Sequence, residues 1–169
     1  MFGDLNRSRI IALSAACIAL IALGSWVSIP FFPVPLTLQT LFVLLAGAVM
    51  RRYAVIPVTL YILLGALGLP VFHNGIAGFG ILLGPTGGYL IGFIPAALVA
   101  GLAYEAKSAR VHIMGLAIAT LVIYAFGISW LMYSTGMGIA AALLMGMLPF
   151  ILGDIVKALA AYLIAQRLP

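Results

Sequence analysis

The sequence predicts an all-α integral membrane protein with six transmembrane helices and both termini on the cytoplasmic side. Two observations lead to this prediction. Of the 169 residues, 66% are hydrophobic and only 7% are charged, whereas about 25% of the residues in a soluble domain carry a charge. In addition, six apolar stretches are separated by short breaks, and most basic residues fall in these breaks.

The composition excludes several classes of protein. A soluble enzyme with a mean hydropathy of +1.31 would have too few polar side chains to cover its surface, and an intrinsically disordered chain has the opposite composition. The net charge of +5 would suggest a nucleic-acid partner in a soluble protein. Here the basic residues flank apolar runs, so we expect a lipid bilayer and no nucleic acid.

Each span is predicted from an apolar run, because a helix needs about 20 apolar residues to cross a hydrocarbon core about 30 Å thick. The runs place the spans at residues 10–27, 36–50, 53–67, 88–104, 112–133 and 138–166, in a single membrane domain of residues 1–169. No small-x-small cleavage site follows the first run, so we expect a retained span and not a signal peptide.

The basic residues support the count of six. With six spans, seven of them lie on the same side of the membrane: Arg7, Arg9, Arg51, Arg52, Lys107, Arg110 and Arg167. Five or seven spans would scatter these residues over both sides. The positive-inside rule makes the shared side cytoplasmic, together with both termini, and so predicts a multi-pass protein of the cell membrane.

The two connections on the opposite face differ from ordinary solvated loops. Residues 28–35 are rich in proline, and residues 68–87 are rich in Gly and Pro but carry no charge. Non-helical backbone at membrane depth is tolerated only where protein or a wet cavity satisfies its polar groups. We therefore expect these loops to fold onto the bundle and cap an external pocket; a merely apolar loop is the alternative.

Asp154 and Lys157 lie well inside the last apolar run. At about 1.5 Å of rise per residue, they lie roughly 20 Å and 15 Å from Arg167 along a helix, and a spacing of three residues puts both side chains on one face. We expect Pro149 to kink or start this helix. Isolated charges at this depth cost several kcal/mol, so the two must pair, face a wet cavity, or both.

Two interpretations of this pair are open. It is either a structural ion pair or part of a site for a small zwitterionic or hydrogen-bonding anion, in which the ammonium holds a carboxylate and the aspartate accepts from N–H groups. Asn74 in the second outer loop supplies a further donor and acceptor. Gln39 and Thr37, at the start of the second span, either face the same cavity or form hydrogen bonds between helices.

Other chemistry is not indicated. His73 and His112 have no partner at metal-ligand spacing, and the lone Cys17 predicts only a small buried residue. The Gly-rich residues 84–88 lack the lysine of a phosphate-binding loop, and no nucleophile or second acid accompanies Asp154. We therefore expect no metal, no cofactor and no enzyme activity. A binding subunit that uses a separate motor fits these features best.

Small residues recur on the first predicted span. Four alanines form small-xxx-small pairs, which allow close helix approach: Ala12, Ala15, Ala16 and Ala19. The approach is either to another helix of the same bundle or to another membrane subunit.

Four segments in order along the chain resemble one known family: residues 33–40, 68–72, 84–93 and 149–157. They are similar to BioY proteins, the biotin-specific substrate-binding (S) components of energy-coupling-factor (ECF) transporters. The resemblance implies a six-helix S-component fold with biotin bound near the external face. It also implies that Asn74, Asp154 and Lys157 contact biotin, and it makes Tyr89 and His73 further candidates for the substrate site.

The resemblance further implies partners. An S component works with a transmembrane coupling subunit, the T component, which two ABC-type ATPases drive, and the alanines of the first span would then contact the T component. The predicted function is capture of extracellular biotin and its uptake through this separate module. An S component for another small vitamin and a non-catalytic membrane assembly subunit are the alternatives.

Overall fold

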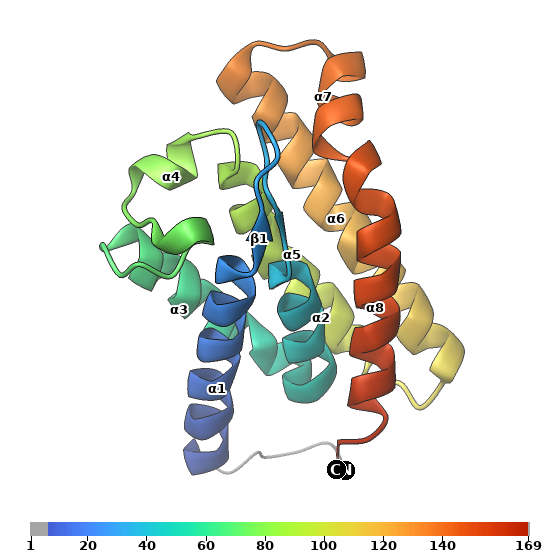
Figure 1. The fold of residues 1–169 in the computed structure, drawn as a ribbon. Helices are drawn as coiled ribbons and strands as arrows, with labels where there is room; N and C mark the ends of the chain where they lie inside the picture. Colours follow the sequence, from blue (N-terminus) through green and yellow to red (C-terminus); the bar gives the residue numbers. More distant parts are fainter. Residues whose placement is uncertain (1–6, 169) are drawn as a thin grey trace.

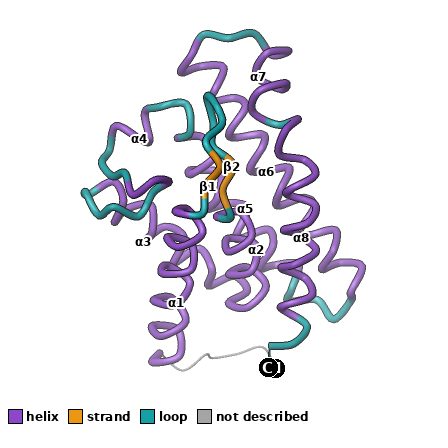
Figure 2. The backbone as a smooth tube through the Cα atoms, viewed as in Figure 1, coloured by secondary structure: helices purple, strands orange, loops and turns teal. Residues whose placement is uncertain are grey.

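A computed structural model describes residues 7–168 as a bundle of helices with a short β-hairpin (Figures 1 and 2). In chain order the elements are α1 (Arg7–Trp26), β1 (Ser28–Ile29), β2 (Leu36–Thr37), α2 (Gln39–Met50), η1 (Arg51–Ala54), α3 (Val55–Ala66), η2 (His73–Gly75), α4 (Gly80–Leu83), α5 (Gly87–Ala103), α6 (Ala109–Thr135), α7 (Ile139–Gly146), η3 (Leu148–Phe150) and α8 (Ile151–Ala165). The start of α1 and the end of α8 lie at the same end of the bundle (Figure 1).

Four helical segments of the described residues are long and apolar enough to cross a membrane. They are Arg7–Trp26, Gln39–Ala66, Ala109–Thr135 and Ile139–Ala165, and the apolar helix α5 is shorter. The second segment contains α2 and α3. The six predicted spans therefore correspond to α1, α2, α3, α5, α6 and the α7–α8 segment, and their number stays a prediction.

A sharp turn at Arg51 separates α2 from α3. Its φ of 56° and ψ of −138° lie outside the helical region, so the two segments are separate helices. Each has 12 residues, or about 18 Å of helix. Arg52 in this turn donates to both oxygens of Glu105 at 2.6 Å. This contact lowers the pKa of the Glu105 carboxyl and joins the α2–α3 turn to the α5–α6 turn.

The fold is mostly helical, as predicted, but the first outer connection adds a short β-hairpin that was not expected. β1 and β2 form an antiparallel hairpin in which Ser28 pairs with Thr37 and Ile29 with Leu36. The second helix therefore begins at Gln39 and not at residue 36. The hairpin lies among the helices (Figure 2), where pairing between its strands satisfies backbone groups that would otherwise be unpaired at this depth.

The second outer connection folds onto the bundle, as predicted. Phe72 is fully buried, and its ring meets the ring of Tyr61 in α3 edge-on at 5.7 Å. The Ser25 hydroxyl of α1 donates to the carbonyl oxygen of Val71 at 2.7 Å. A buried ring and a hydrogen bond thus hold this uncharged loop against α1 and α3.

The last predicted span is divided into two helices. α7 ends at Gly146 and α8 begins at Ile151, with a 3₁₀ turn that contains Pro149 between them. Proline has no N–H group and clashes with the preceding helical turn, and the predicted break at this residue is confirmed. The break places Asp154 in the first turn of α8.

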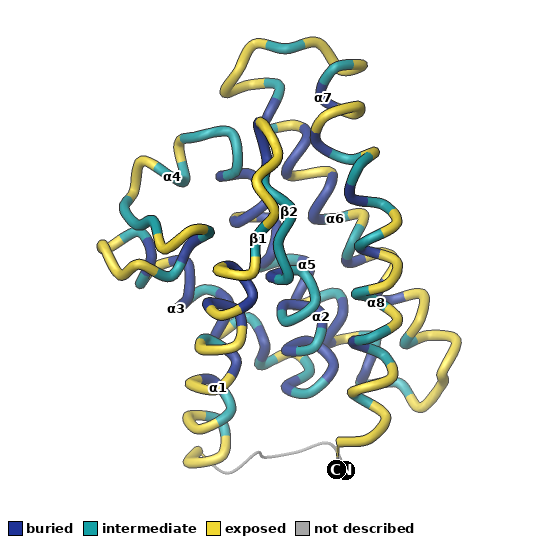
Figure 3. The backbone as a smooth tube through the Cα atoms, in the orientation of Figure 1, coloured by how far each residue is buried: buried dark blue, intermediate teal, exposed yellow. Residues whose placement is uncertain are grey.

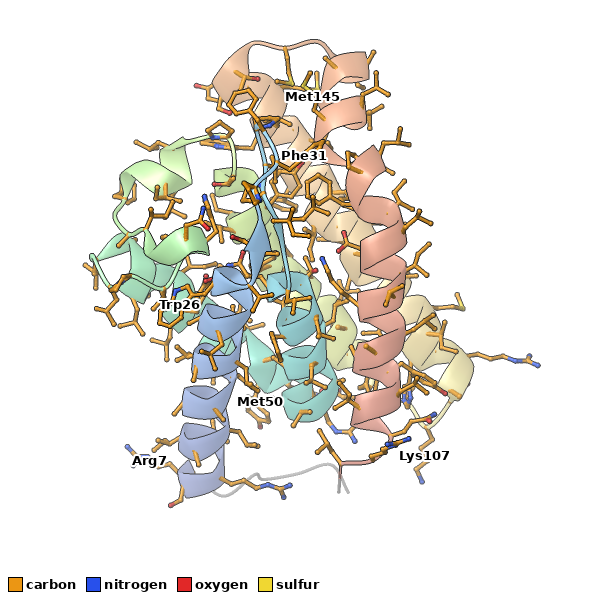
Figure 4. The ribbon with its side chains drawn as sticks, viewed as in Figure 1. Arg7, Trp26, Phe31, Met50, Lys107 and Met145 are labelled. Atoms are coloured by element: carbon orange, nitrogen blue, oxygen red, sulfur yellow. The ribbon has the colours of Figure 1, made fainter. Side chains whose placement is uncertain are left out.

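The two ends of the molecule differ in character. Arg7 and Lys107 lie near the lower end of the view in Figure 4, and Phe31 and Met145 lie near the upper end. Between them lies an apolar core that includes the free Cys17, which is buried as expected. This arrangement agrees with a topology that gathers the basic residues on one face.

Gly47 allows α2 and α5 to approach closely. A Cβ at this position would lie 2.6 Å from the Cβ of Ala100 and 3.1 Å from the carbonyl oxygen of Ala97. We expect Gly47→Ala to destabilise the bundle by about 1–3 kcal/mol, the usual cost of overpacking, measured by thermal unfolding in detergent. Gly153→Ala is the matched control, because no atom lies within 4 Å of its added Cβ. An equal loss in both variants would contradict the close-approach argument.

Candidate functional site

Asp154 and Lys157 of α8 form a buried ion pair. The Lys157 Nζ lies 2.9 Å from the Asp154 Oδ1, and the side chains of the lysine and the aspartate are 12% and 6% exposed. Residues three apart lie on the same face of a helix, so α8 itself holds the two groups together. The prediction that the charges pair inside the apolar run is confirmed.

Two hydroxyl groups complete the surroundings of the Asp154 carboxylate. Thr40 of α2 donates to Oδ1 at 3.1 Å, and Tyr124 of α6 donates to Oδ2. A carboxylate has about four acceptor sites, so three donors leave room for one more. An ammonium has more than one N–H to donate, and among the described residues only Asp154 accepts from Lys157. Lys157 can therefore donate further hydrogen bonds to a ligand, and Asp154 can accept one more.

The ion pair lines a cavity. About 540 Å³ of space between its atoms is empty, part of it open to solvent. Its polar lining residues are Thr37, Gln39, Thr40, His73, Thr86, Tyr89, Tyr124, Asp154 and Lys157, and its apolar ones are Val34, Pro35, Leu90, Phe93, Ile123 and Phe150. A pair of opposite charges thus lies among hydroxyl, amide and hydrophobic groups.

Gln39 has both of the roles considered from the sequence. Its side chain lines the cavity, and its amide donates to the Tyr61 hydroxyl of α3. The Thr37 hydroxyl donates to the Gln39 Oε1 at 3.1 Å, and the Tyr61 hydroxyl donates to the Val71 carbonyl oxygen at 2.8 Å. This series of hydrogen bonds links the hairpin, α2, α3 and the second outer loop on one side of the cavity.

The second outer loop puts His73, and not Asn74, on the lining of the cavity. Asn74 is exposed with a φ of 55°, and its Oδ1 accepts from the Ser28 hydroxyl of β1 at 2.7 Å. Asn74 therefore ties the loop to the hairpin, and its predicted contact with a ligand stays a prediction. Burial lowers the pKa of His73, which favours the neutral imidazole.

Tyr89 also lines the cavity. Its hydroxyl donates to the carbonyl oxygen of Gly146 at 2.7 Å, which holds α5 against the end of α7. The ring is therefore fixed in place as a wall, together with those of Phe93 and Phe150.

The four alanines of α1 do not pack inside the bundle. Each of the four is exposed: Ala12, Ala15, Ala16 and Ala19. Much of α1 is accordingly yellow in Figure 3. Of the two interpretations of their spacing, close packing within the bundle is therefore wrong for the described part of the chain. The face is free for the approach of another helix.

The cavity has the groups of a binding site. It offers a cation, an anion, hydrogen-bonding groups and aromatic walls. Within residues 7–168, no group of three His, Cys, Asp or Glu side chains is placed to hold a metal ion. The arrangement fits a small molecule that combines an anionic group, N–H donors and an apolar ring.

Comparison with known proteins identifies the family. The sequence matches the model of the BioY family over residues 3–169. The chain belongs to the BioY family. It is 45% identical to the biotin transporter BioY of Thermotoga maritima over 152 residues, with 89% of each chain covered. It is 42% identical to the probable biotin transporter BioY of Pyrococcus horikoshii over 163 residues, which cover 96% of this chain and 97% of that protein.

A solved structure shares the fold of this BioY chain. The crystal structure at 2.1 Å of the S-component for biotin from an ECF-type ABC transporter superimposes with a TM-score of 0.87. The two chains are 26% identical, and the match covers 99% of this chain and 94% of that one. The BioY chain is accordingly a membrane transporter component and not an enzyme.

The BioY sequence contains cavity residues that sequence reasoning missed. Thr40 lies within the recognised segment 33–40, and Tyr124 is a hydroxyl-bearing side chain in the middle of an apolar run. A polar group at that depth needs a hydrogen-bond partner, so a hydroxyl within an apolar run was the signal in the sequence that could have revealed these residues. Which partner it meets depends on helix packing, and the structure shows that both meet Asp154.

Removal of one donor to Asp154 tests this network in the BioY chain. We expect Tyr124→Phe to cost about 1.5–3 kcal/mol, as for a hydrogen bond to a charged group, measured by thermal unfolding of the ligand-free protein. Tyr133→Phe is the matched control, because Tyr133 is 81% exposed. Unfolding midpoints that are the same for both variants and wild type would show that the Tyr124 hydroxyl does not stabilise the carboxylate.

Proposed function

We propose that this chain is a biotin-binding S component that captures biotin outside the cell and mediates its uptake, driven by a separate ATP-hydrolysing module. The observation that carries the proposal is the buried Asp154–Lys157 pair, which keeps unused hydrogen-bonding capacity at a cavity. The family of the chain, and relatives and a solved S component whose names specify biotin, support it.

The groups of biotin complement those of the cavity. Biotin has a carboxylate on a flexible chain, and a ureido ring with N–H donors and a carbonyl group fused to an apolar thioether ring. We propose that the Lys157 ammonium holds the carboxylate while aromatic rings such as that of Phe93 contact the thioether ring. In the opposite arrangement, Asp154 and Lys157 both bond the ureido ring.

Further residues have supporting roles in this proposal. Thr37, Gln39, His73 and Tyr89 line the cavity and complete the substrate site. Asn74 acts at the cover of the site, because its hydrogen bond to Ser28 fixes the loop that carries His73.

The proposed topology places the basic end of the bundle in the cytoplasm. It has six spans and both termini inside, since the positive-inside rule puts Arg and Lys on that side. The exposed alanines of α1 then form the docking face for a T component, which two ABC-type ATPases drive. No cofactor is part of the proposal.

The carboxylate and the ammonium are each required for biotin binding in this proposal. We expect Asp154→Asn and Lys157→Met to weaken binding by roughly 30-fold to a few thousand-fold, because loss of one partner from a buried charge pair costs about 2–5 kcal/mol. Titration calorimetry of protein purified from biotin-starved cells measures this. Glu105→Gln, which removes the exposed ion pair with Arg52, is the matched control and should bind like wild type.

The same titrations separate the alternatives. A structural ion pair predicts that the double variant Asp154→Leu/Lys157→Met keeps full function, since paired apolar replacements of buried ion pairs are often tolerated. Our proposal predicts a folded protein without biotin binding. A folded wild type that binds another small vitamin and not biotin would overturn the choice of ligand. Undiminished binding of biotin methyl ester would assign the pair to the ureido ring.

The docking face is tested separately from the biotin site. We expect Ala16→Trp to keep biotin binding but to lose copurification with the T component and biotin uptake, because a large ring prevents close helix approach. Ile118→Trp is the control, since Ile118 is also exposed (47%) but lies on α6. Copurification that both variants retain equally would exclude this face of α1 as the docking face.

A further inference from the structure

A second cavity lies between α6 and α8 and differs in character from the first. It has about 890 Å³ of empty space, part of it open to the surroundings. Large side chains in its lining are about half exposed: Ile113 48%, Leu121 58%, Ile155 53% and Leu159 51%. The Thr120 hydroxyl on its wall donates to the Leu116 carbonyl oxygen of its own helix at 3.0 Å. The lining is mostly aliphatic, and its other polar side chains are Tyr124, Asp154 and Tyr162. We refer to this cavity as the α6–α8 groove.

The length of the α6–α8 groove matches one leaflet of a bilayer. On α6 its lining extends from Ile113 to Tyr124, and eleven residues of helix rise about 16 Å. Half of a hydrocarbon core about 30 Å thick is about 15 Å. One extended acyl chain of a phospholipid in the leaflet on the basic side spans this distance.

In the described part of the chain, unpaired basic residues lie near one end of the α6–α8 groove only. Arg110 lies one helical turn before Ile113 on α6, Lys107 lies in the preceding turn, and Arg167 follows α8. None of the three forms an ion pair within residues 7–168, where Glu105 is held by Arg52 and Asp154 by Lys157. At the other end the groove is lined by Met147, Ile151, Tyr124 and Asp154, and the Asp154 carboxylate is held there by Lys157, Thr40 and Tyr124.

We infer that the α6–α8 groove holds one acyl chain of an anionic phospholipid, with its phosphate at Arg110 and the neighbouring basic residues. A phospholipid of this kind complements the groove, because its anionic headgroup can meet the basic residues while its apolar chain lies along the aliphatic lining. A partner helix fits less well, because close helix approach needs small residues at the edges, and here these are isoleucines and leucines. The inference concerns a lipid and goes beyond the proposed biotin function.

The bound chain would lie directly behind the biotin site. Tyr124 and Asp154 line both the α6–α8 groove and the first cavity. A lipid chain in the groove covers the outer side of this wall and supports the position of Tyr124 against the carboxylate.

The test is native mass spectrometry of the full chain after reconstitution in bilayers with equal amounts of phosphatidylglycerol and phosphatidylcholine. We expect wild type to retain one lipid with a preference for phosphatidylglycerol of about fivefold, the effect of one basic residue at a membrane surface. Arg110→Gln should abolish the preference, whereas Arg7→Gln, at the basic end of α1, should keep it.

Filling the α6–α8 groove gives the second test. Ala117→Phe and Ala158→Phe place a ring inside it, and we expect both to lose the retained lipid, whereas Ala140→Phe on the exposed surface of α7 keeps it. Ala117 is exposed, so its variant is expected to fold. The inference would be overturned if wild type retained no lipid or retained the two lipids equally. It would also be overturned if neither Ala117→Phe nor Ala158→Phe abolished the retention. None of these readouts involves biotin.

Discussion

The buried carboxylate of Asp154 is the constraint on which the rest of the structure depends. A lone charge at membrane depth is costly, and its cost is offset here by donors from separate helices: Thr40 on α2, Tyr124 on α6 and Lys157 on α8. The bonds from Thr40 and Tyr124 hold α2 and α6 against α8. Lys157 and the carboxylate can still form further hydrogen bonds. The groups that hold the helices together therefore also make the cavity polar.

The irregular segments of the chain follow from the need to enclose this cavity. The turn at Arg51 and the 3₁₀ turn at Pro149 produce short helices, and the hairpin and the second outer loop contribute Pro35 and His73 to the lining. Non-helical backbone at such a depth is stable only where other protein groups pair with it. In the hairpin, the two strands pair with each other. In the second outer loop, the Val71 carbonyl oxygen accepts from Ser25 of α1 and Tyr61 of α3.

Much of the fold was predictable from the sequence, because apolar runs and prolines mark membrane helices and their breaks. The ion pair was predictable as well, since acids and bases inside such runs are rare. Which face of each helix points into the bundle was not predictable, because residues that contact lipid and residues that contact protein are equally apolar. For this reason the sequence left the exposure of Ala16 open and did not reveal Tyr124 as a partner of Asp154. It also missed the hairpin, and it favoured Asn74 where His73 lines the cavity.

The most direct test of the central claim is an experimental structure of the chain with biotin bound. The account predicts that polar atoms of biotin lie within hydrogen-bonding distance of Asp154 or Lys157, and that Thr40 and Tyr124 keep their bonds to the carboxylate. Biotin bound elsewhere, with the ion pair unchanged and without ligand contact, would contradict it.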